Sequence, residues 1–429
     1  MQLRYNLRIY PEPSQQDALA RAFGCARVVF NDALRARRTA HENGEPYPSD
    51  GELSKRVITH AKSTPERAWL GEVSAVVLQQ ALADLNTAYR NFFASVTGIR
   101  KGRKVAVPRF RSSKDSWQSI RFTRNARFTI LGNKRLRLPK IGDLRVRWSR
   151  ELPTAPSSVT IIKDGAGRYF ASFVVRTENE VLPRTESKVG IDLGLTHFAV
   201  LSDSTKVAAP KFLRQAARKL RRLQKSLSRK VKGSNNRKKA VTKVARVHAK
   251  VADTRRDWQH KLSTTIIRDN QAVYVEDLCV TGLGRTRLAK SVHDAGWSSF
   301  TGMLEYKATR HGRAFARIDR WLPTSQACSA CGRIDGPKPL SVRSWTCPCG
   351  VTHDRDINAA KNVLAAGQAD NSNDRGAQVR PASVSAPRHE AVTHSDAARS
   401  ARSVERVSVV HGGEDVKGPS SSHARPAAP

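Results

Sequence analysis

The chain opens with a short segment in which every second residue, from Leu3 to Ile9, is apolar. Such a period of two is typical of a half-buried β-strand. Pro11 and Pro13 end the pattern, and apolar residues then recur at helical spacing from Leu19 to Leu34. We expect a long helix here, beginning near Ser14, which stands three residues before Asp17 as in a capping box.

A second long helix is predicted from Glu72 to Val96, where apolar residues again follow one helical face. The Gly- and Pro-containing segment from His41 to Asp50 should be the loop before it. After a basic stretch from Arg100 to Lys114, the pattern changes to short strands separated by turns. These are Ser119 to Phe122, Arg135 to Leu138, Leu144 to Trp148, Ser158 to Lys163 and Tyr169 to Arg176. Closely spaced strands of this kind predict a small sheet or barrel.

The second part of the chain alternates between apolar strands and longer helices. Strands are predicted over Lys188 to Leu193, Phe198 to Leu201, Ala272 to Val275 and Ala314 to Ile318, and helices over Ser298 to His311 and Asp356 to Ala366. Between Lys211 and Asn270 the helical pattern is broken once, at Gly233-Ser-Asn-Asn, which predicts a hairpin of two helices. Beyond Gly367 the chain has no Phe, Tyr or Trp, so we expect a disordered tail.

Charge narrows the class of partner. The chain has 76 Lys and Arg against 37 Asp and Glu, a formal charge of +39, and such a surface favours a polyanion such as nucleic acid. The basic residues of the expected hairpin lie three or four positions apart, which suits a helix that follows a phosphate backbone. No apolar run approaches the roughly 18 residues of a transmembrane helix, and the N-terminus lacks the apolar segment of a signal peptide. We therefore expect no membrane partner and a cytoplasmic location.

Four of the six cysteines lie close together in sequence, as Cys328-x-x-Cys331 and Cys347-x-Cys349. A glycine follows the second cysteine of each pair. Four soft thiolates at this spacing predict a tetrahedral structural Zn²⁺ site. The second pair is one residue shorter than usual, so His353 is the substitute for the last ligand. With four protein ligands the ion has no open position and would not catalyse.

Three carboxylates occupy positions where side chains tend to face a cleft. Asp192 lies at the end of a strand before a glycine turn, Glu276 ends another strand, and Asp356 begins a helix. Phosphodiester hydrolysis by two divalent ions, such as Mg²⁺, needs a set of this kind. Each acid also has an ordinary structural role available, as a turn residue, a surface ion-pair partner or a helix-start residue.

Neighbouring acids offer alternatives to two of these three. Asp277 and Asp354 rank second in their pairs, and Asp203 ranks third near the first strand. Between the two last aspartates, we expect Asp356 to face the cleft and Asp354 to cap the helix.

Several motifs together resemble one protein family. They are Phe23-Gly-Cys-Ala-Arg-Val-Val-Phe-Asn, Leu138-Pro-Lys-Ile-Gly, Gly190-Ile-Asp-Leu-Gly, Val275-Glu-Asp-Leu, Asp294-Ala-Gly-Trp, Cys328-Ser-Ala-Cys-Gly and His353-Asp-Arg-Asp-Ile-Asn-Ala-Ala-Lys-Asn. In this order they resemble the TnpB (OrfB) proteins of insertion-sequence transposons, over roughly residues 1 to 367. The resemblance implies an RNA-guided DNA endonuclease related to the ancestors of type V CRISPR effectors.

The resemblance also implies a multidomain architecture of α+β and α/β parts. A wedge β-barrel (residues 1–10 and 100–184) would be interrupted by a helical recognition domain (11–99). A RuvC-like nuclease of RNase H fold (185–326 and 351–368) would follow, with an inserted zinc ribbon (327–350) and a disordered tail (369–429). By position, the nuclease triad would be Asp192, Glu276 and Asp356, holding Mg²⁺ as two ions.

The same resemblance implies the partners. A transposon-encoded guide RNA would pair with double-stranded target DNA, and the protein would read only a short motif beside the target. A monomer is favoured. Two other functions compete with this one: a nucleic-acid-binding accessory protein of transposition without cleavage activity, and a strand-transferring transposase. The second is disfavoured because the last acid of the common RNase H-like transposases is a glutamate, whereas here it is Asp356.

Overall fold

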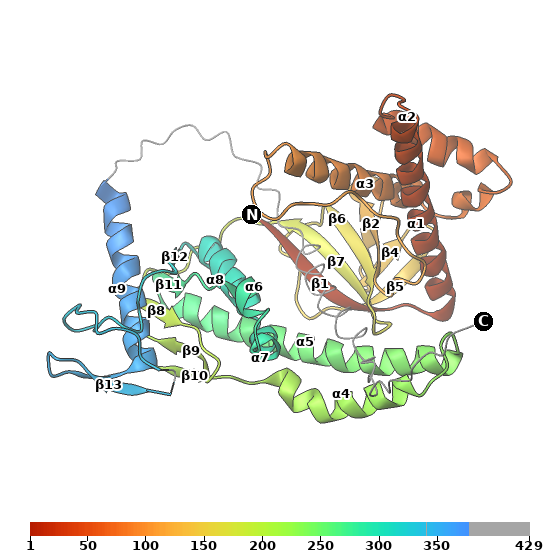
Figure 1. Ribbon diagram of the computed structural model, residues 1–429. Coiled ribbons are helices and arrows are strands. Elements are labelled where there is room, and N and C mark those ends of the chain that lie inside the picture. The colour runs from red at the N-terminus through yellow and green to blue at the C-terminus, as the bar shows by residue number, and fades with distance from the viewer. Residues whose placement is uncertain (340, 377–429) are drawn as a thin grey trace, which may run out of the picture.

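The computed structural model describes residues 1–339 and 341–376, and these build two main β-sheets, each with its own helices (Figure 1). The first sheet has seven strands in the order β2-β6-β7-β1-β5-β4-β3, all paired antiparallel. The strands are β1 (Gln2–Tyr10), β2 (Gln118–Thr123), β3 (Thr129–Ile130), β4 (Arg135–Leu138), β5 (Gly142–Arg147), β6 (Ser158–Lys163) and β7 (Tyr169–Arg176). Every strand expected in this region is confirmed, and β4, β6 and β7 have the predicted bounds.

Two long helices cover the apolar face of this sheet. They are α1 (Pro13–Glu42) and α3 (Ala75–Val96), with α2 (Asp50–Ser54) and short helical turns at Lys55–His60, Ala61–Ser63 and Ala68–Glu72 between them. Alternate residues of β1, such as Leu7 and Ile9, are buried in a core shared with both helices. The strands β2 and β3 at the two ends do not pair with each other in the described chain, so the sheet is a half-barrel rather than a closed barrel.

The start of α1 differs from the prediction. Its N-cap is Glu12, and Gln15 completes the capping box, whereas Ser14 lies inside the first turn. Pro13 explains the shift, because proline lacks an N–H to donate and suits the first helical position. The helix α3 also begins a few residues after the expected Glu72, because a 3₁₀ turn ends at that residue and Val73 is extended.

The second sheet has five strands in the order β10-β9-β8-β11-β12. They are β8 (Lys188–Asp192), β9 (His197–Leu201), β10 (Lys206–Ala208), β11 (Ala272–Glu276) and β12 (Ala314–Ile318). Strands β8, β11 and β12 are parallel, while β9 and β10 are antiparallel to their neighbours. The predicted strands are confirmed here, and β10 is an addition.

Helices lie on both faces of this second sheet. One face packs against α5 (Asn235–Asp269) and α8 (Trp297–His311) through residues such as Val273 and Phe300. The other face packs against α9 (Arg355–Gly376) through Tyr274 and Val363. Figure 1 shows α9 and α5 on opposite sides of the strands. The short helices α6 (Val280–Leu283) and α7 (Ala289–Ala295) connect β11 to α8.

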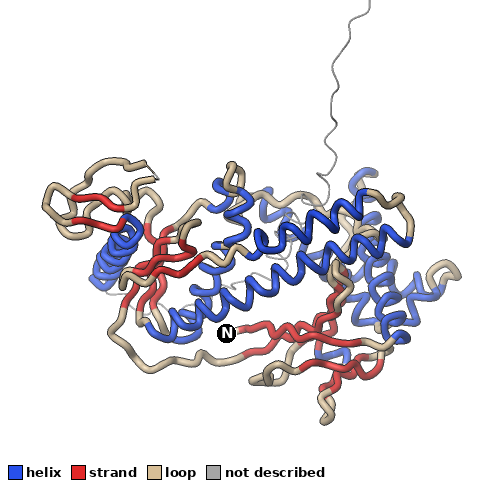
Figure 2. The backbone as a smooth tube through the Cα atoms, turned by 90° about the horizontal axis from the view of Figure 1, so that it is seen from below, coloured by secondary structure: helices blue, strands red, loops and turns tan. Residues whose placement is uncertain are grey.

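The expected basic hairpin is confirmed as α4 (Phe212–Ser228) packed along α5 (Figure 2). Ser234 caps α5 by accepting a hydrogen bond from the backbone N–H of Arg237 at 3.1 Å. The start of α4 is capped by the buried Asp294, whose carboxylate accepts hydrogen bonds from the backbone of Leu213 and Arg214. Asp294-Ala-Gly-Trp therefore holds the base of the hairpin.

A small two-stranded hairpin, β13 (Ser344–Thr346) and β14 (Thr352–Asp354), stands between β12 and α9. The helix α9 runs to Gly376, so the expected disordered tail does not begin at residue 369. Ala365, Ala366 and Ala369 are good helix formers, which favours continuation of the helix beyond the predicted end. The rest of that tail, 377–429, lies outside the described residues. Within the described residues, no helix combines the length and the apolar character needed to cross a membrane.

Candidate nuclease and metal sites

The two sheet-borne acids are placed by strand register. Ile191 of β8 pairs with Val275 of β11 in parallel, so Asp192 and Glu276 follow at the same level of neighbouring strands. Ile191 and Val275 both belong to the core shared with α5 and α8. Since side chains alternate along a strand, Asp192 and Glu276 face the opposite side, which α9 covers.

A glycine lets α9 lie directly on β8. A Cβ atom at Gly190 would stand 2.3 Å from the carbonyl oxygen of Ala360 and 2.4 Å from the backbone nitrogen of Leu364. A second close approach occurs at Gly367, where a Cβ would stand 2.1 Å from the ring of Tyr274. These contacts hold the helix against the strands. Asp356 lies in the first turn of this helix, on the same side of the sheet as the other two acids.

The three carboxylates interact electrostatically. Burial raises the pKa of Asp192 to about 7, and the negative charges of Glu276 and Asp356 add to the increase. Burial, with the charge of Asp277, also raises the pKa of Glu276. Burial makes these carboxyl groups costly to ionise, and a bound cation would offset that cost. The structure therefore places the three predicted acids close enough to interact electrostatically.

Two residues that the sequence did not single out contact Asp356. Arg343, from the segment before β13, places Nη1 3.4 Å from Oδ1 of Asp356 and donates from Nη2 to Thr196 Oγ1 at 3.1 Å. His197 Nδ1 lies 3.9 Å from Oδ2 of Asp356. His197 follows Asp192 closely in sequence and could have been noticed, whereas the position of Arg343 depends on the path of a loop.

The alternative acids have other partners. Asp354 caps α9 as predicted, because its Oδ1 accepts hydrogen bonds from the backbone of Asp356 and Ile357, both at 3.1 Å. Its second oxygen accepts from Lys206 Nζ. Asp277 forms an ion pair with Arg320. Asp203 accepts a hydrogen bond from the backbone of Thr205 in a turn.

The four clustered cysteines converge although they come from two separate turns. Cys328 Sγ lies 3.8 Å from Cys349 Sγ, and Cys331 Sγ lies 3.7 Å from Cys347 Sγ. Among the described residues, these four form the only group of three or more possible ligands whose donor atoms all lie within 4.8 Å of one another. The shortened Cys347-Pro-Cys349 pair thus still supplies two converging sulfurs, and the acids are spaced more widely.

Glycines make both cysteine turns possible. Gly332 and Gly350 adopt φ angles of +75° and +89°, which disfavour residues with a Cβ. Although burial opposes it, backbone N–H groups of Cys331 and Ala330 and the side chain of His353 lower the pKa of Cys328 to about 6. Although a backbone hydrogen bond at Cys349 opposes it, burial and the other three thiols raise the pKa of Cys347 to about 12. The case for a metal ion therefore depends on the converging sulfurs.

His353 lies beside the four sulfurs instead of among them. Its Nε2 is 3.0 Å from Cys328 Sγ, and its ring packs against Trp345 with a centroid distance of 4.9 Å. Such a contact orients a thiolate without replacing it.

Two asparagines of α9 join the cysteine segment to the helix that carries Asp356. Asn358 is buried, accepts a hydrogen bond from the backbone of Ser329 at 2.8 Å and donates to Ala327 O at 2.7 Å. Asn362 donates to Thr324 O and Ala327 O, each at 2.7 Å. The Asn-Ala-Ala-Lys-Asn motif is therefore a structural joint, a role that the sequence did not reveal.

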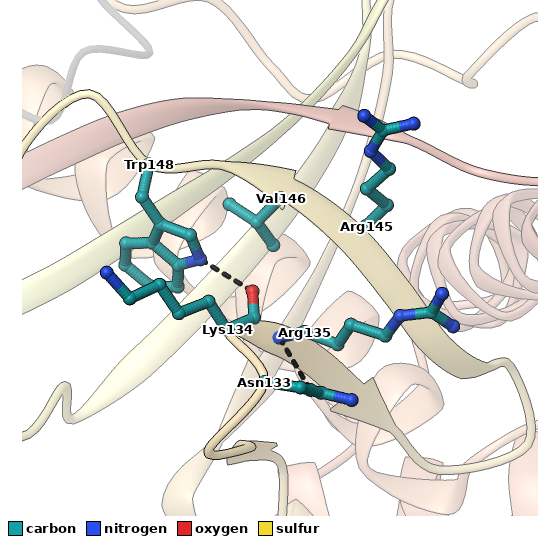
Figure 3. Close-up of a pocket in the computed structure, with 6 residues that line it drawn as sticks. All are labelled: Asn133, Lys134, Arg135, Arg145, Val146 and Trp148. Carbon is teal, nitrogen blue, oxygen red and sulfur yellow. Dashed lines mark hydrogen bonds between the residues drawn. The ribbon is translucent and has the colours of Figure 1, made fainter.

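Away from these sites, the antiparallel sheet has a cationic cavity of about 400 Å³ (Figure 3). It is lined by Asn133, Lys134, Arg135, Arg145, Val146 and Trp148, and Trp148 Nε1 donates to Lys134 O at 2.6 Å. Figure 3 shows the guanidinium groups of Arg135 and Arg145 directed away from the indole ring. With no carboxylate in its lining, this cavity offers nothing to a catalytic cation.

Three family models match parts of the chain. They are described as "Probable transposase" of the OrfB_IS605 type (residues 172–287), "Cas12f1-like, TNB domain" (297–363) and "Helix-turn-helix domain" of OrfB_IS605 proteins (1–46). In the last region this chain has one strand followed by one continuous 30-residue helix, not two short helices.

Similar proteins cover most of the chain. A Streptomyces pristinaespiralis protein named "Putative RNA-guided DNA endonuclease" is 45% identical over 85% of this chain and 89% of its own length. An Escherichia coli protein named "Putative RNA-guided DNA endonuclease InsQ" is 32% identical over 85% and 92%.

A cryo-EM structure of a Cas12f1-sgRNA-target DNA complex covers 83% of both chains with a TM-score of 0.51 at 13% identity, which shows a shared fold. The sequence matches show descent as well as fold, because one extends over most of both chains at 45% identity. The chain belongs to the OrfB (TnpB-like) family, which includes these two relatives named putative RNA-guided DNA endonucleases.

Proposed function

We propose that the chain is an RNA-guided, metal-dependent DNA endonuclease of an insertion-sequence transposon. It would hydrolyse phosphodiester bonds in double-stranded DNA beside a short target-adjacent motif. The observation that carries the proposal is the meeting of Asp192, Glu276 and Asp356, at which the pKa of Asp192 rises to about 7.

The topology of the second sheet supports a RuvC-like nuclease of RNase H fold. Its order, β10-β9-β8-β11-β12, combines an antiparallel hairpin with three parallel strands. The candidate acids lie at the carboxyl ends of β8 and β11 and at the start of α9. Carboxyl ends of parallel strands are the usual position of active sites in such sheets.

The acids fit divalent cations, because burial and the charges of Glu276 and Asp356 raise the pKa of Asp192 in spite of Arg355, and a bound cation would favour its ionised form. We assign Asp192, Glu276 and Asp356 as the residues that hold Mg²⁺, as two ions. Divalent ions at such a site help to ionise the attacking water and stabilise the leaving oxygen. Arg343 and His197 are placed to orient Asp356 before the ions bind.

The cysteine cluster fits one structural Zn²⁺, because the four sulfurs converge to within 4.8 Å of one another. We assign Cys328, Cys331, Cys347 and Cys349 as its ligands. Their role would be to fix the segment before α9, since Asn358 and Asn362 fasten that segment to the helix.

The proposed partners are a guide RNA and double-stranded target DNA, bound by a monomer in the cytoplasm. The names of the relatives and the net charge of +39 support nucleic-acid partners. We also propose the division into a wedge (1–10 and 100–184), a helical recognition domain (11–99), a nuclease (185–326 and 351–368) and a zinc ribbon (327–350).

Plasmid cleavage tests this function. RNA that copurifies with the protein is sequenced, a plasmid matching its variable end is prepared, and cutting with Mg²⁺ is compared between the wild type and Asp192→Ala. The matched control is Asp203→Ala, a turn acid on the same sheet. We expect Asp192→Ala alone to abolish cutting. Equal cutting by wild type and Asp192→Ala would refute the mechanism, and salt-sensitive RNA binding without cutting by any variant would favour an accessory role.

A further inference from the structure

A second cationic cavity lies between the antiparallel sheet and the helical hairpin. Its volume is about 420 Å³, and it is lined by Arg8 of β1, by Ala166, Gly167 and Arg168 of the β6–β7 turn, and by Arg246, Lys250, Asp253 and Thr254 of α5. Figure 1 shows the hairpin passing beneath this sheet. Residues as far apart in sequence as Arg8 and Thr254 therefore line one pocket of ligand-binding size.

The cavity carries more positive charge than its own acids can balance. Arg168 pairs with Asp164 and with Asp253, which is the single carboxylate in the lining. In the described part of the chain, no carboxylate forms an ion pair with Arg8, Arg246 or Lys250. Three cations therefore remain available to an anion in the cavity.

Arg8 is the most informative of these cations. Its Nη1 is buried and has no hydrogen-bond partner among the described residues. Its guanidinium lies 5.1 Å from the centre of the Phe170 ring, while that of Arg168 lies 5.2 Å from the same ring. Burial, followed by the charge of Arg168, lowers the pKa of Arg8, and Tyr10 and the charge of Asp164 offset only part of this decrease. A buried guanidinium N–H without an acceptor destabilises the free protein, and a ligand oxygen would satisfy it.

The cavity is separated from the candidate nuclease acids. The acids lie on the α9 face of the second sheet, whereas α5, which carries Arg246 and Lys250, covers the opposite face. A phosphate held in the cavity is therefore not the phosphate of the bond being cut.

From these observations we infer that the Arg8 cavity is a phosphate clamp for the guide RNA. One backbone phosphate of the RNA would accept hydrogen bonds from Arg8, Arg246 and Lys250. Because the clamp draws on both the sheet and the hairpin, RNA binding would fix the two parts relative to each other. This inference rests on the proposed function, since it identifies the resident nucleic acid as RNA.

The test measures RNA affinity for a double variant, Arg246→Gln/Lys250→Gln. The probe is the RNA recovered from the wild-type protein, and affinities are measured over a range of salt concentrations. We expect a loss of about tenfold and a decrease of about 1 in the slope of log affinity against log salt. The matched control is Lys261→Gln/Arg268→Gln, which removes two charges from exposed ion pairs of the same helix, outside the cavity. Its affinity should stay within about threefold of wild type.

Two results would overturn the clamp. Equal losses of RNA affinity in the cavity and control variants would show that the effect comes from net charge and not from this cavity. An equal or larger loss for a duplex DNA probe, measured without RNA, would assign the cavity to DNA. Failure of the proposed function looks different, because the protein would then show clamp-dependent RNA binding but no Mg²⁺-dependent cutting.

Arg8→Gln adds a measurement that separates binding from folding. We expect its melting temperature without RNA to equal or exceed that of wild type, because the buried Nη1 group that lacks a hydrogen-bond acceptor has been removed. Its RNA affinity should nevertheless fall about as much as in the double variant. A lower melting temperature together with an unchanged salt slope would show that Arg8 is only structural.

Discussion

The cysteine cluster and the acid cluster are assembled in opposite ways. The four thiols come from the single segment Cys328 to Cys349, and their sulfurs lie within 4.8 Å of one another before any ion is considered. The three acids come from β8, β11 and α9, and burial, together with the charges of Glu276 and Asp356, raises the pKa of Asp192. The first site needs only its own turns, whereas the second needs a whole sheet and the helix that crosses it.

The two sites are nevertheless connected through α9. Asn358 and Asn362 fasten the base of the cysteine segment to this helix, and Gly190 lets the helix rest on β8. The cysteine cluster, which forms from one segment, can thus fix the position of Asp356, which belongs to a site formed from three distant elements. The following experiments test that connection.

The largest effect should come from the two aspartates at the start of α9. We expect Asp356→Ala to lower the cutting rate by ~10³-fold, about 4 kcal/mol of transition-state stabilisation, because it removes a proposed Mg²⁺ ligand. Asp354→Ala removes the helix cap and should cost about 1 kcal/mol of stability with a smaller loss of rate. Cutting rates and thermal melts distinguish them. Loss of cutting only in Asp354→Ala would reverse the assignment.

Next in size is the loss of the proposed zinc site. Cys347→Ser should reduce zinc from about one ion per chain and lower the unfolding free energy by ~2 kcal/mol or more. Cutting should also fall, because the segment that carries Asn358's partners would loosen. Elemental analysis and thermal melts measure both effects. The control is Cys279→Ser, an exposed cysteine outside the cluster. A zinc-free wild-type protein with full activity would contradict the connection.

A moderate effect should appear in the pH dependence of stability without metal. The folded-state pKa of Asp192 is about 7, above its unfolded value of about 3.9. The raised pKa favours the folded state fully below about pH 4, and this contribution is lost as the pH rises through about 7. Mg²⁺ should therefore raise the melting temperature more above pH 7 than below about pH 5.

Asp192→Asn is the control for this pH dependence, since a neutral amide cannot titrate. Its melting temperature should vary less with pH and respond less to Mg²⁺. If Mg²⁺ raised the melting temperature of the variant and of the wild type equally at every pH, the ions would bind elsewhere.

The smallest effect should come from Arg343→Ala. Arg343 pairs with Asp356 at 3.4 Å and would therefore compete with a cation for that carboxylate. Exposed pairs contribute up to about 1 kcal/mol, so the Mg²⁺ concentration for half-maximal binding should fall about two- to fivefold. Titration calorimetry measures this directly. Arg333→Ala, an exposed arginine of the same segment, should leave the titration unchanged.

The same contrast explains how much could be predicted from the sequence. Strands with clear alternation, such as β4 and β6, were predicted with their bounds because burial on one face imposes the pattern. The cysteine cluster was predictable from the spacing of its residues, because all four cysteines lie in one short segment of the chain. The position of Asp192 beside Glu276 follows from strand register, and the sequence suggested only that each ends a strand.

Other features depend on contacts that no local pattern encodes. Arg343 approaches Asp356 because the cysteine segment turns back toward β8, and Asn358 is buried because that segment packs on α9. The helix start at Pro13 was missed for a local reason. The N-cap is Glu12, and glutamate is a weaker N-cap signal than a serine such as Ser14. The cavity around Arg8 joins parts of the chain separated by most of the folded sequence.

Asp356 lies near the end of the folded chain, which affects when the acid cluster can assemble during synthesis. A ribosome makes the chain from its N-terminus, and domains generally fold in that order. The antiparallel sheet and the basic hairpin are complete once α5 ends at Asp269, whereas α9 begins only at Arg355. A nascent chain would therefore expose its cationic surfaces to RNA well before its three acids could meet. In this protein the order of synthesis itself delays the assembly of the proposed nuclease centre until a partner could already be bound.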